Sequence, residues 1–294
     1  MERDEILARL RNIEVLPTFP AVVGEVVNKI EDPMSSAGDI ARIMDPSMAG
    51  EVLRIANTAY YGTRSFRRIT SIEHAVAIIG LEQLSQIMLH MPFLSMMNDN
   101  GGPGRETFVK HSLICAVVSK TISATLGVGD PGAVYIAGLM HDIGSVIIYR
   151  YFQEEWSVIT SLVREEGYAW VDAEREVLSC DHGVVGAWLL TSWNIPLSIT
   201  EAVMYHHVPE IATGNGWNAK LIDVGNRFAR KMNLGHNKGS IDEFINANKE
   251  LIVLAETLGP PMSPSRELDL FEGIYALLRN TKMLPSDTGD VEDD

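Results

Sequence analysis

The stretch Ala137-Gly138-Leu139-Met140-His141-Asp142-Ile143-Gly144 places a histidine and an aspartate next to each other inside an apolar run. Asp130-Pro131 upstream predicts a helix start, because aspartate caps free N–H groups and proline fits the first helical position. From there apolar residues occupy nearly every side of a predicted helix over 131–152, which indicates burial in a core. An ionised carboxylate is costly there unless a cation compensates it. Asp142 therefore needs a partner, and a metal held with histidines is the obvious candidate.

The size and charge of the chain limit its class. Its 294 residues, 46% of them hydrophobic, suffice for one large or two modest packed domains. The net charge of −15 argues against a general affinity for nucleic acid or for an anionic membrane, because both need a positive surface. The chain has two cysteines, a charged N-terminus without a signal-peptide core, and no expected membrane span. We therefore expect a cytoplasmic protein without a disulfide framework.

Helical signals recur along the chain and nothing alternates with period two, so we expect an all-α fold. Ser36-x-x-Asp39 and Thr70-x-x-Glu73 are capping-box patterns that open two of the predicted helices. The predicted helices cover residues 2–14, 21–30, 39–44, 46–59, 74–79, 84–91, 106–126, 131–152, 154–166, 172–193, 197–207 and 219–232, with one or two more between 241 and 284.

A cluster of Gly, Pro and Asn at 98–104 is the strongest breaker signal and predicts a boundary between subdomains. We expect an N-terminal helical subdomain over 1–100 and a helical core with the His/Asp cluster over 101–236. C-terminal helices should follow over 237–284. The acidic tail 285–294 has almost no large apolar residue, so we expect it to be disordered.

Histidines fall on several of the predicted inward helix faces. His111 and His182 each share a face with apolar residues three, four or seven positions away, and His206 ends a helix beside His207. A single buried histidine is more often bonded to a carbonyl, and a helix-end pair can simply face the helix dipole. Together with His141-Asp142, however, they come from four predicted helices that can meet at one point, as in metal-binding bundles.

Several motifs follow one another between residues 10 and 235. They are Leu16-Pro17-Thr18-Phe19-Pro20, Asp45-Pro46, Val52-Leu53-Arg54-Ile55-Ala56-Asn57-Thr58-Ala59-Tyr60, Ile72-x-x-Ala75-x-x-x-x-Gly80 and His182-x-x-x-Gly186-x-x-Leu189-x-x-x-Trp193-x-x-Pro196 followed by His206-His207. Together with His141-Asp142-Ile143-Gly144, these motifs resemble the HDOD domain of the HD superfamily. The resemblance implies an all-α, multi-helix bundle of HD-superfamily type with an N-terminal helical subdomain. It also implies a role in bacterial signal transduction, often as an output module.

The resemblance also implies a set of metal ligands. His111, His141 and Asp142 match the first metal positions of the HD superfamily. His182, His206 and His207 match positions that complete a second metal site in the related HD-GYP phosphodiesterases, with Asp142 as the bridge. A histidine-rich set with one carboxylate suits one or two divalent ions of Fe, Mn, Zn or Ni better than Mg or Ca.

Three departures separate this chain from the hydrolases of the superfamily. At the late aspartate ligand the chain offers Asn226, a weaker neutral ligand, and the nearest carboxylate, Asp223, lies three residues earlier. Ser145 stands where a lysine is expected, which removes a cation that could hold a phosphate. Val208-Pro209-Glu210-Ile211 follows His206-His207, without a Gly-Tyr-Pro signature.

Three functions remain open at this point. The first is a regulatory HDOD module that keeps the metal site and binds a signalling protein or a small ligand. The second is a metal-dependent phosphohydrolase or phosphodiesterase that acts on a nucleotide or cyclic nucleotide through metal-activated water. In the third, the histidines are hydrogen-bonded core residues without metal. The basic loop Arg64-x-x-Arg67-Arg68 is a candidate partner surface, although such a loop is more often simply solvated.

Overall fold

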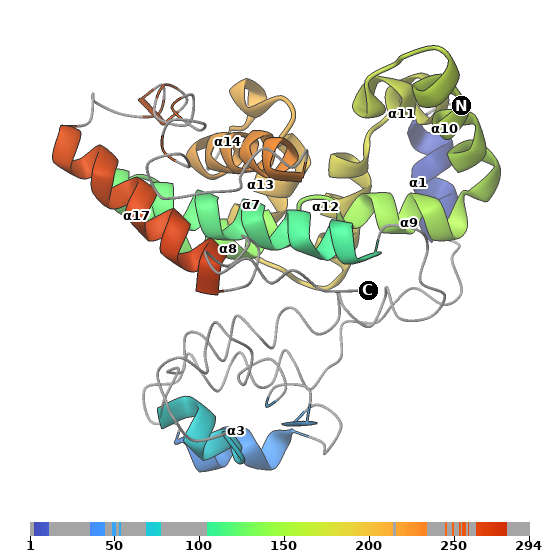
Figure 1. The fold of residues 1–294 in the computed structure, drawn as a ribbon. Helices are drawn as coiled ribbons and strands as arrows, with labels where there is room; N and C mark the ends of the chain where they lie inside the picture. The colour runs from blue at the N-terminus through green and yellow to red at the C-terminus, as the bar shows by residue number, and fades with distance from the viewer. Residues whose placement is uncertain are drawn as a thin grey trace, which may run out of the picture. The chain divides into compact units, whose positions relative to one another are not determined.

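The computed structural model describes residues 3–11, 36–44, 49–50, 53, 69–77, 105–213, 216–233 and 263–280, with single positions at 245, 249, 253, 255, 256 and 258. Within these ranges every regular element is helical, which confirms the all-α prediction (Figure 1). The elements are α1 (Arg3–Arg11), α3 (Ala37–Ile43), α7 (Arg105–Leu126), α8 (Pro131–Met140), α9 (Ile143–Tyr151), α10 (Gln153–Glu165), α11 (Trp170–Leu178), α12 (His182–Ser192), α13 (Leu197–Tyr205), the 3₁₀ turn η2 (Pro209–Ile211), α14 (Gly216–Asn233) and α17 (Pro264–Asn280).

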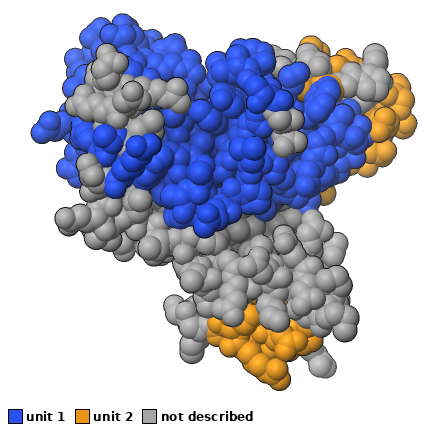
Figure 2. Space-filling view, turned by 180° about the vertical axis from the view of Figure 1, so that it is seen from behind, with its two compact units in different colours: residues 1–17, 111–229 blue, residues 18–110, 230–294 orange. Residues whose placement is uncertain are grey.

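The chain forms two compact units, coloured separately in Figure 2. Unit 1 joins Met1–Pro17 to His111–Ala229, and unit 2 consists of Thr18–Lys110 and Arg230–Asp294. Within unit 1, Arg9 of α1 forms an ion pair with Glu155 of α10 and stacks over the ring of Phe152. The subdomain boundaries at residues 100 and 236 stay a prediction.

Several sequence patterns lie outside the described residues. These are the segments 16–20, 45–46, 64–68, 98–104 and 285–294.

Side-chain caps fix the helix starts that the sequence predicts. The Asp130 carboxylate accepts from the backbone N–H groups of Gly132 and Ala133, and Pro131 opens α8. Ser36 and Asp39 form the predicted capping box at the start of α3. The helix described over residues 72–77 starts two positions before the predicted range 74–79, and Ser71 rather than Thr70 accepts from the N–H of His74.

The prediction of one helix over 131–152 was wrong, because the chain breaks at His141 and Asp142. The His141 Nδ1–H donates to the carbonyl oxygen of Gly138 at 2.7 Å, which satisfies a carbonyl left free at the end of α8. Asp142 leaves helical geometry (φ −98°, ψ 9°), and α9 restarts after it. The break gives His141 and Asp142 side-chain directions that a continuous helix would not provide.

The prediction of one helix over 172–193 was also wrong. Ser179 adopts the left-handed conformation (φ 54°) at the end of α11. Asp181 then caps α12 by accepting from the N–H of Val184, while Arg175 of α11 donates to its other carboxylate oxygen at 2.7 and 2.9 Å. This turn places His182 at the first position of α12.

The segment that contains α8 and α9 is strongly apolar. No membrane span was predicted, but the 21-residue stretch Pro131–Tyr151 is long and apolar enough to span a membrane. However, 67% of its most apolar window is buried inside the protein, as in a core segment. α9 packs on α12 through Gly144 and Gly186, where the two backbones approach closely.

Gly144→Ala should destabilise the protein by about 3 kcal/mol or more, because an added Cβ would overlap the His182 carbonyl oxygen and lie 2.7 Å from the Gly186 nitrogen. Differential scanning calorimetry measures the change. Gly50→Ala is the matched control, since no atom lies within 4 Å of a Cβ there. Equal unfolding temperatures for the two variants would contradict the close packing of α9 on α12.

Candidate metal centre

The structure brings together all six side chains that the sequence singles out. They are His111 of α7, His141 at the end of α8, Asp142 before α9, His182 at the start of α12, and His206 and His207 at the end of α13. They form two groups that share Asp142, and within each group the candidate ligand atoms lie within 4.8 Å of one another. All six residues belong to unit 1.

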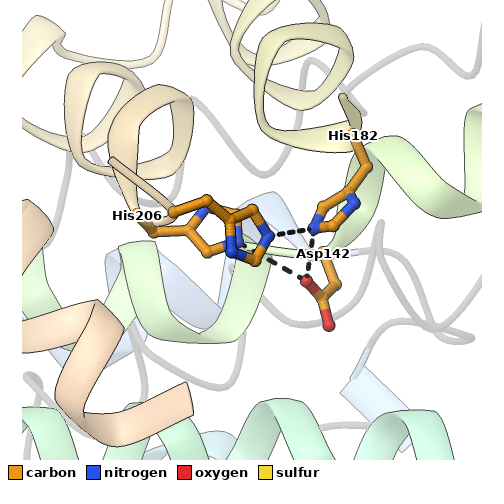
Figure 3. A group of neighbouring side chains, drawn as sticks. Asp142, His182 and His206 are labelled. Atoms are coloured by element: carbon orange, nitrogen blue, oxygen red, sulfur yellow. Dashed lines mark hydrogen bonds and ion pairs between the residues drawn. The ribbon is translucent and has the colours of Figure 1, made fainter. Parts of the chain in front are cut away.

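The Asp142 carboxylate lies between the two groups. Its Oδ2 atom is 3.1 Å from Nε2 of His141 and 3.5 Å from Nε2 of His111. Its Oδ1 atom is 3.0 Å from Nε2 of His182 and 3.7 Å from Nε2 of His206, and Figure 3 shows Asp142 beside these last two rings. Each carboxylate oxygen therefore faces its own set of imidazole nitrogens.

The imidazole nitrogens also face one another. The Nε2 atoms of His111 and His141 are 3.2 Å apart, and those of His182 and His207 are 2.9 Å apart. Two ligands that bind one ion at about 2.1 Å and at right angles are about 3.0 Å apart. The Nε2 atom of His206 and the Oδ1 atom of Asp142 are buried, and they face only the other groups of this cluster. The donor set thus fits a metal ion on either side of the carboxylate.

Hydrogen bonds on the opposite ring nitrogen orient three of the histidines. The Nδ1 atoms of His141 and His206 each lie 2.7 Å from a carbonyl oxygen three residues earlier. A carbonyl only accepts, so Nδ1 carries the proton and Nε2 keeps its lone pair in the neutral ring. His182 uses Oε2 of Glu174 instead, at 2.6 Å.

Glu174 is the residue that the sequence reasoning missed. A signal for it exists in the spacing Trp170-x-x-x-Glu174-x-x-x-Leu178, which places the glutamate on the buried face of α11.

The close packing of these groups shifts their protonation. Burial opposes the charged form of Asp142, but the charge on His141 and hydrogen bonds from three histidines hold the pKa of this carboxyl well below its usual value. Burial likewise disfavours protonated His182, yet the Glu174 and Asp142 carboxylates outweigh it and raise the pKa of His182 to about 10. For His206 burial prevails and lowers the pKa. Without metal, His182 therefore bridges two carboxylates as an imidazolium.

Asp223 and Asn226, the two candidates for a further oxygen ligand, both lie in α14 but have different surroundings. The Asp223 carboxylate accepts from Nε of Arg227 at 2.9 Å, one turn along the helix. The Asn226 side chain is buried, and its Oδ1 atom has no hydrogen-bond partner. Of the two residues, Asp223 is thus engaged by Arg227, and Asn226 keeps a buried oxygen without a partner.

The family model of the HDOD domain matches residues 16–209. Three solved structures are similar in fold. An HDOD domain protein of unknown function from Geobacter sulfurreducens has 24% identity and a TM-score of 0.73, covering 95% of this chain and 96% of that one. A candidate phosphohydrolase from Shewanella amazonensis SB2B has 20% identity and a TM-score of 0.74, covering 94% and 96%. A candidate signal transduction protein from Marinobacter aquaeolei VT8 has 16% identity and a TM-score of 0.64, covering 95% and 65%.

The chain also matches part of a longer curated protein. An uncharacterised protein of Treponema pallidum (strain Nichols) is 24% identical over 200 residues, which make up 66% of this chain and 38% of that protein. The chain therefore spans well under half the length of this relative.

In chelator-treated protein, His182 should stay protonated up to about pH 10 while His206 is neutral at pH 7. Because the folded pKa of His182 lies above its ordinary value of 6.5, the stability that it contributes is complete below pH 6.5 and is lost as the pH rises through about 10. Ring chemical shifts followed by NMR, with unfolding temperatures between pH 7 and 10, measure both effects. Titration of His182 near pH 6.5 would contradict this geometry.

Proposed function

The chain belongs to the HDOD domain family, and from that premise we propose that it is a regulatory module of signal transduction that holds a transition-metal centre and does not hydrolyse phosphoesters. The observation that carries the proposal is the Asp142 carboxylate, whose two oxygens face two separate sets of imidazole nitrogens. A half-buried carboxylate whose Oδ1 atom is shielded from water needs compensating positive charge, and a bound cation would supply it.

The ligand chemistry narrows the choice of ion. His111, His141, Asp142, His182, His206 and His207 would hold one or two ions. Imidazole ligands suit Fe, Mn, Zn or Ni, whereas Mg²⁺ and Ca²⁺ prefer a shell of oxygen atoms. Buried Asn226 would add one neutral oxygen donor.

The same site argues against phosphoester hydrolysis. Phosphoryl transfer needs fixed positive charge for the phosphate oxygens in addition to an activated water molecule. Half-buried Ser145 stands where the family resemblance implies a lysine, and neutral Asn226 stands where it implies an aspartate. A signalling partner or a small ligand that responds to the occupied centre therefore fits these residues better than a phosphate substrate does.

A metal-dependent phosphohydrolase that acts on a nucleotide or cyclic nucleotide is the second candidate. It is favoured by the bridging position of Asp142 and by the fold shared with the Shewanella protein. A transition ion bound there would lower the pKa of a water molecule and so supply a nucleophile near neutral pH. The fold shared with the Marinobacter protein supports the signalling proposal to the same limited extent.

Protein purified without a histidine tag should contain one or two transition ions per chain by elemental analysis, and Asp142→Ala should lose them. The variant should also unfold at a lower temperature, because it leaves the histidine cluster uncompensated. Asp223→Ala is the matched control: its carboxylate faces Arg227, so metal content should not change. Equal metal content in all three proteins would contradict the proposed ligands.

Metal-loaded protein should show no turnover above the buffer rate with bis(p-nitrophenyl) phosphate, nucleotides or cyclic dinucleotides. The physical reason is the missing cation at position 145. Hydrolysis by the wild-type protein that disappears in Asp142→Ala would instead establish the phosphohydrolase.

A further inference from the structure

Glu174 is a fully buried carboxylate on α11 with hydrogen bonds to both of its oxygens. Oε2 accepts from the backbone N–H of His182 at 2.9 Å and lies 2.6 Å from the Nδ1 atom of the same residue. Oε1 accepts from the indole Nε1–H of Trp170 at 2.9 Å. The carboxylate thus joins α11 to the first residue of α12, directly behind the histidine cluster.

The position of His182 in its helix explains why a carboxylate is needed. His141 and His206 follow the last turns of α8 and α13, where backbone carbonyls are free to accept from Nδ1–H. His182 begins α12, and the free backbone groups at a helix N-terminus are N–H donors. They cannot accept from Nδ1–H, so an acceptor must come from another element.

We propose that Glu174 is a positioning residue of the metal centre, which fixes His182 with its proton on Nδ1 and its Nε2 lone pair directed toward the metal beside Asp142. A carboxylate behind a ligating histidine orients the ring and increases its basicity. The proposal rests on the proposed metal centre and adds to it a residue outside the ligand set.

The residues around Glu174 leave its Oε2 atom available to His182. Its neighbour Arg175 donates to Asp181 rather than to Glu174. Trp170, which holds Oε1, packs edge-on against Trp156 at a centroid distance of 5.1 Å, and Trp156 packs against Tyr149 at 5.3 Å. The aromatic row fixes the indole donor and thereby the orientation of the carboxylate.

Glu174→Gln tests the proposal with little change in size. Glutamine has one acceptor oxygen, and its NH₂ group cannot accept, so it cannot serve Trp170 and His182 together. Competition with a chromophoric chelator should show zinc affinity reduced roughly 10–100-fold. In NMR spectra of the zinc-loaded proteins, the Nδ1–H resonance of His182 should move upfield as its carboxylate acceptor is lost.

Glu201→Gln is the matched control, because this buried glutamate accepts from the N–H and hydroxyl groups of Thr213. Its zinc affinity should equal that of the wild type. Trp170→Phe provides a second test if Glu174→Gln does not fold, since it removes the bond to Oε1 and keeps an aromatic ring beside Trp156. We expect it to lower zinc affinity by less than the roughly 10-fold minimum expected for Glu174→Gln and to shift the His182 resonance slightly.

The outcomes separate this proposal from the metal centre itself. Wild-type protein that takes up no zinc would refute the metal centre, and the positioning role with it. Zinc-binding wild-type protein with unchanged affinity in Glu174→Gln would refute the positioning role alone. A loss of affinity in Trp170→Phe with an unchanged His182 resonance would also refute it, because packing of α11 would then set the affinity.

Discussion

The enclosure of one half-buried carboxylate, Asp142, among histidines is the constraint on which unit 1 depends. A carboxylate removed from water is strongly unfavourable unless charge or hydrogen bonds compensate it. The chain supplies that compensation from α7, α8, α12 and α13, which must all meet at the same point. The tight approach of α9 to α12 at Gly144 follows from this requirement, because it places His182 within reach of the carboxylate.

Positions at helix ends determine how three of the histidine rings around Asp142 are oriented. His141 and His206 lie at the C-terminal ends of helices, and each donates from Nδ1 to a free carbonyl group there. The backbone therefore fixes the proton on Nδ1 and directs Nε2 toward the centre. The third starts a helix and uses the side chain of Glu174. The ligand nitrogens are therefore held in place by the fold before any ion binds, which is the preorganisation that a selective metal site requires.

Much of this arrangement was predictable from local chemistry. The caps at Asp130 and Ser36 follow from residue type alone, and the apolar faces around the histidines predicted that they converge. The breaks at His141 and Ser179 were missed, because the apolar residues on both sides favour a continuous helix. The structure marks both breaks with local contacts, the bond from the His141 ring to the Gly138 carbonyl and the Asp181 cap of α12. Glu174 was not predicted for a related reason. Its hydrogen bond to His182 joins α11 to α12 across the break at Ser179, so helical spacing could not relate the two residues.

The central claim is that metal binds at the Asp142 carboxylate. Crystals of the metal-loaded protein, measured on both sides of the absorption edge of the bound metal, test it most directly. The account predicts one or two anomalous peaks, each at bonding distance from an Asp142 oxygen and from Nε2 atoms of the facing histidines. Anomalous density only elsewhere, with the Asp142 carboxylate free of metal, would contradict it.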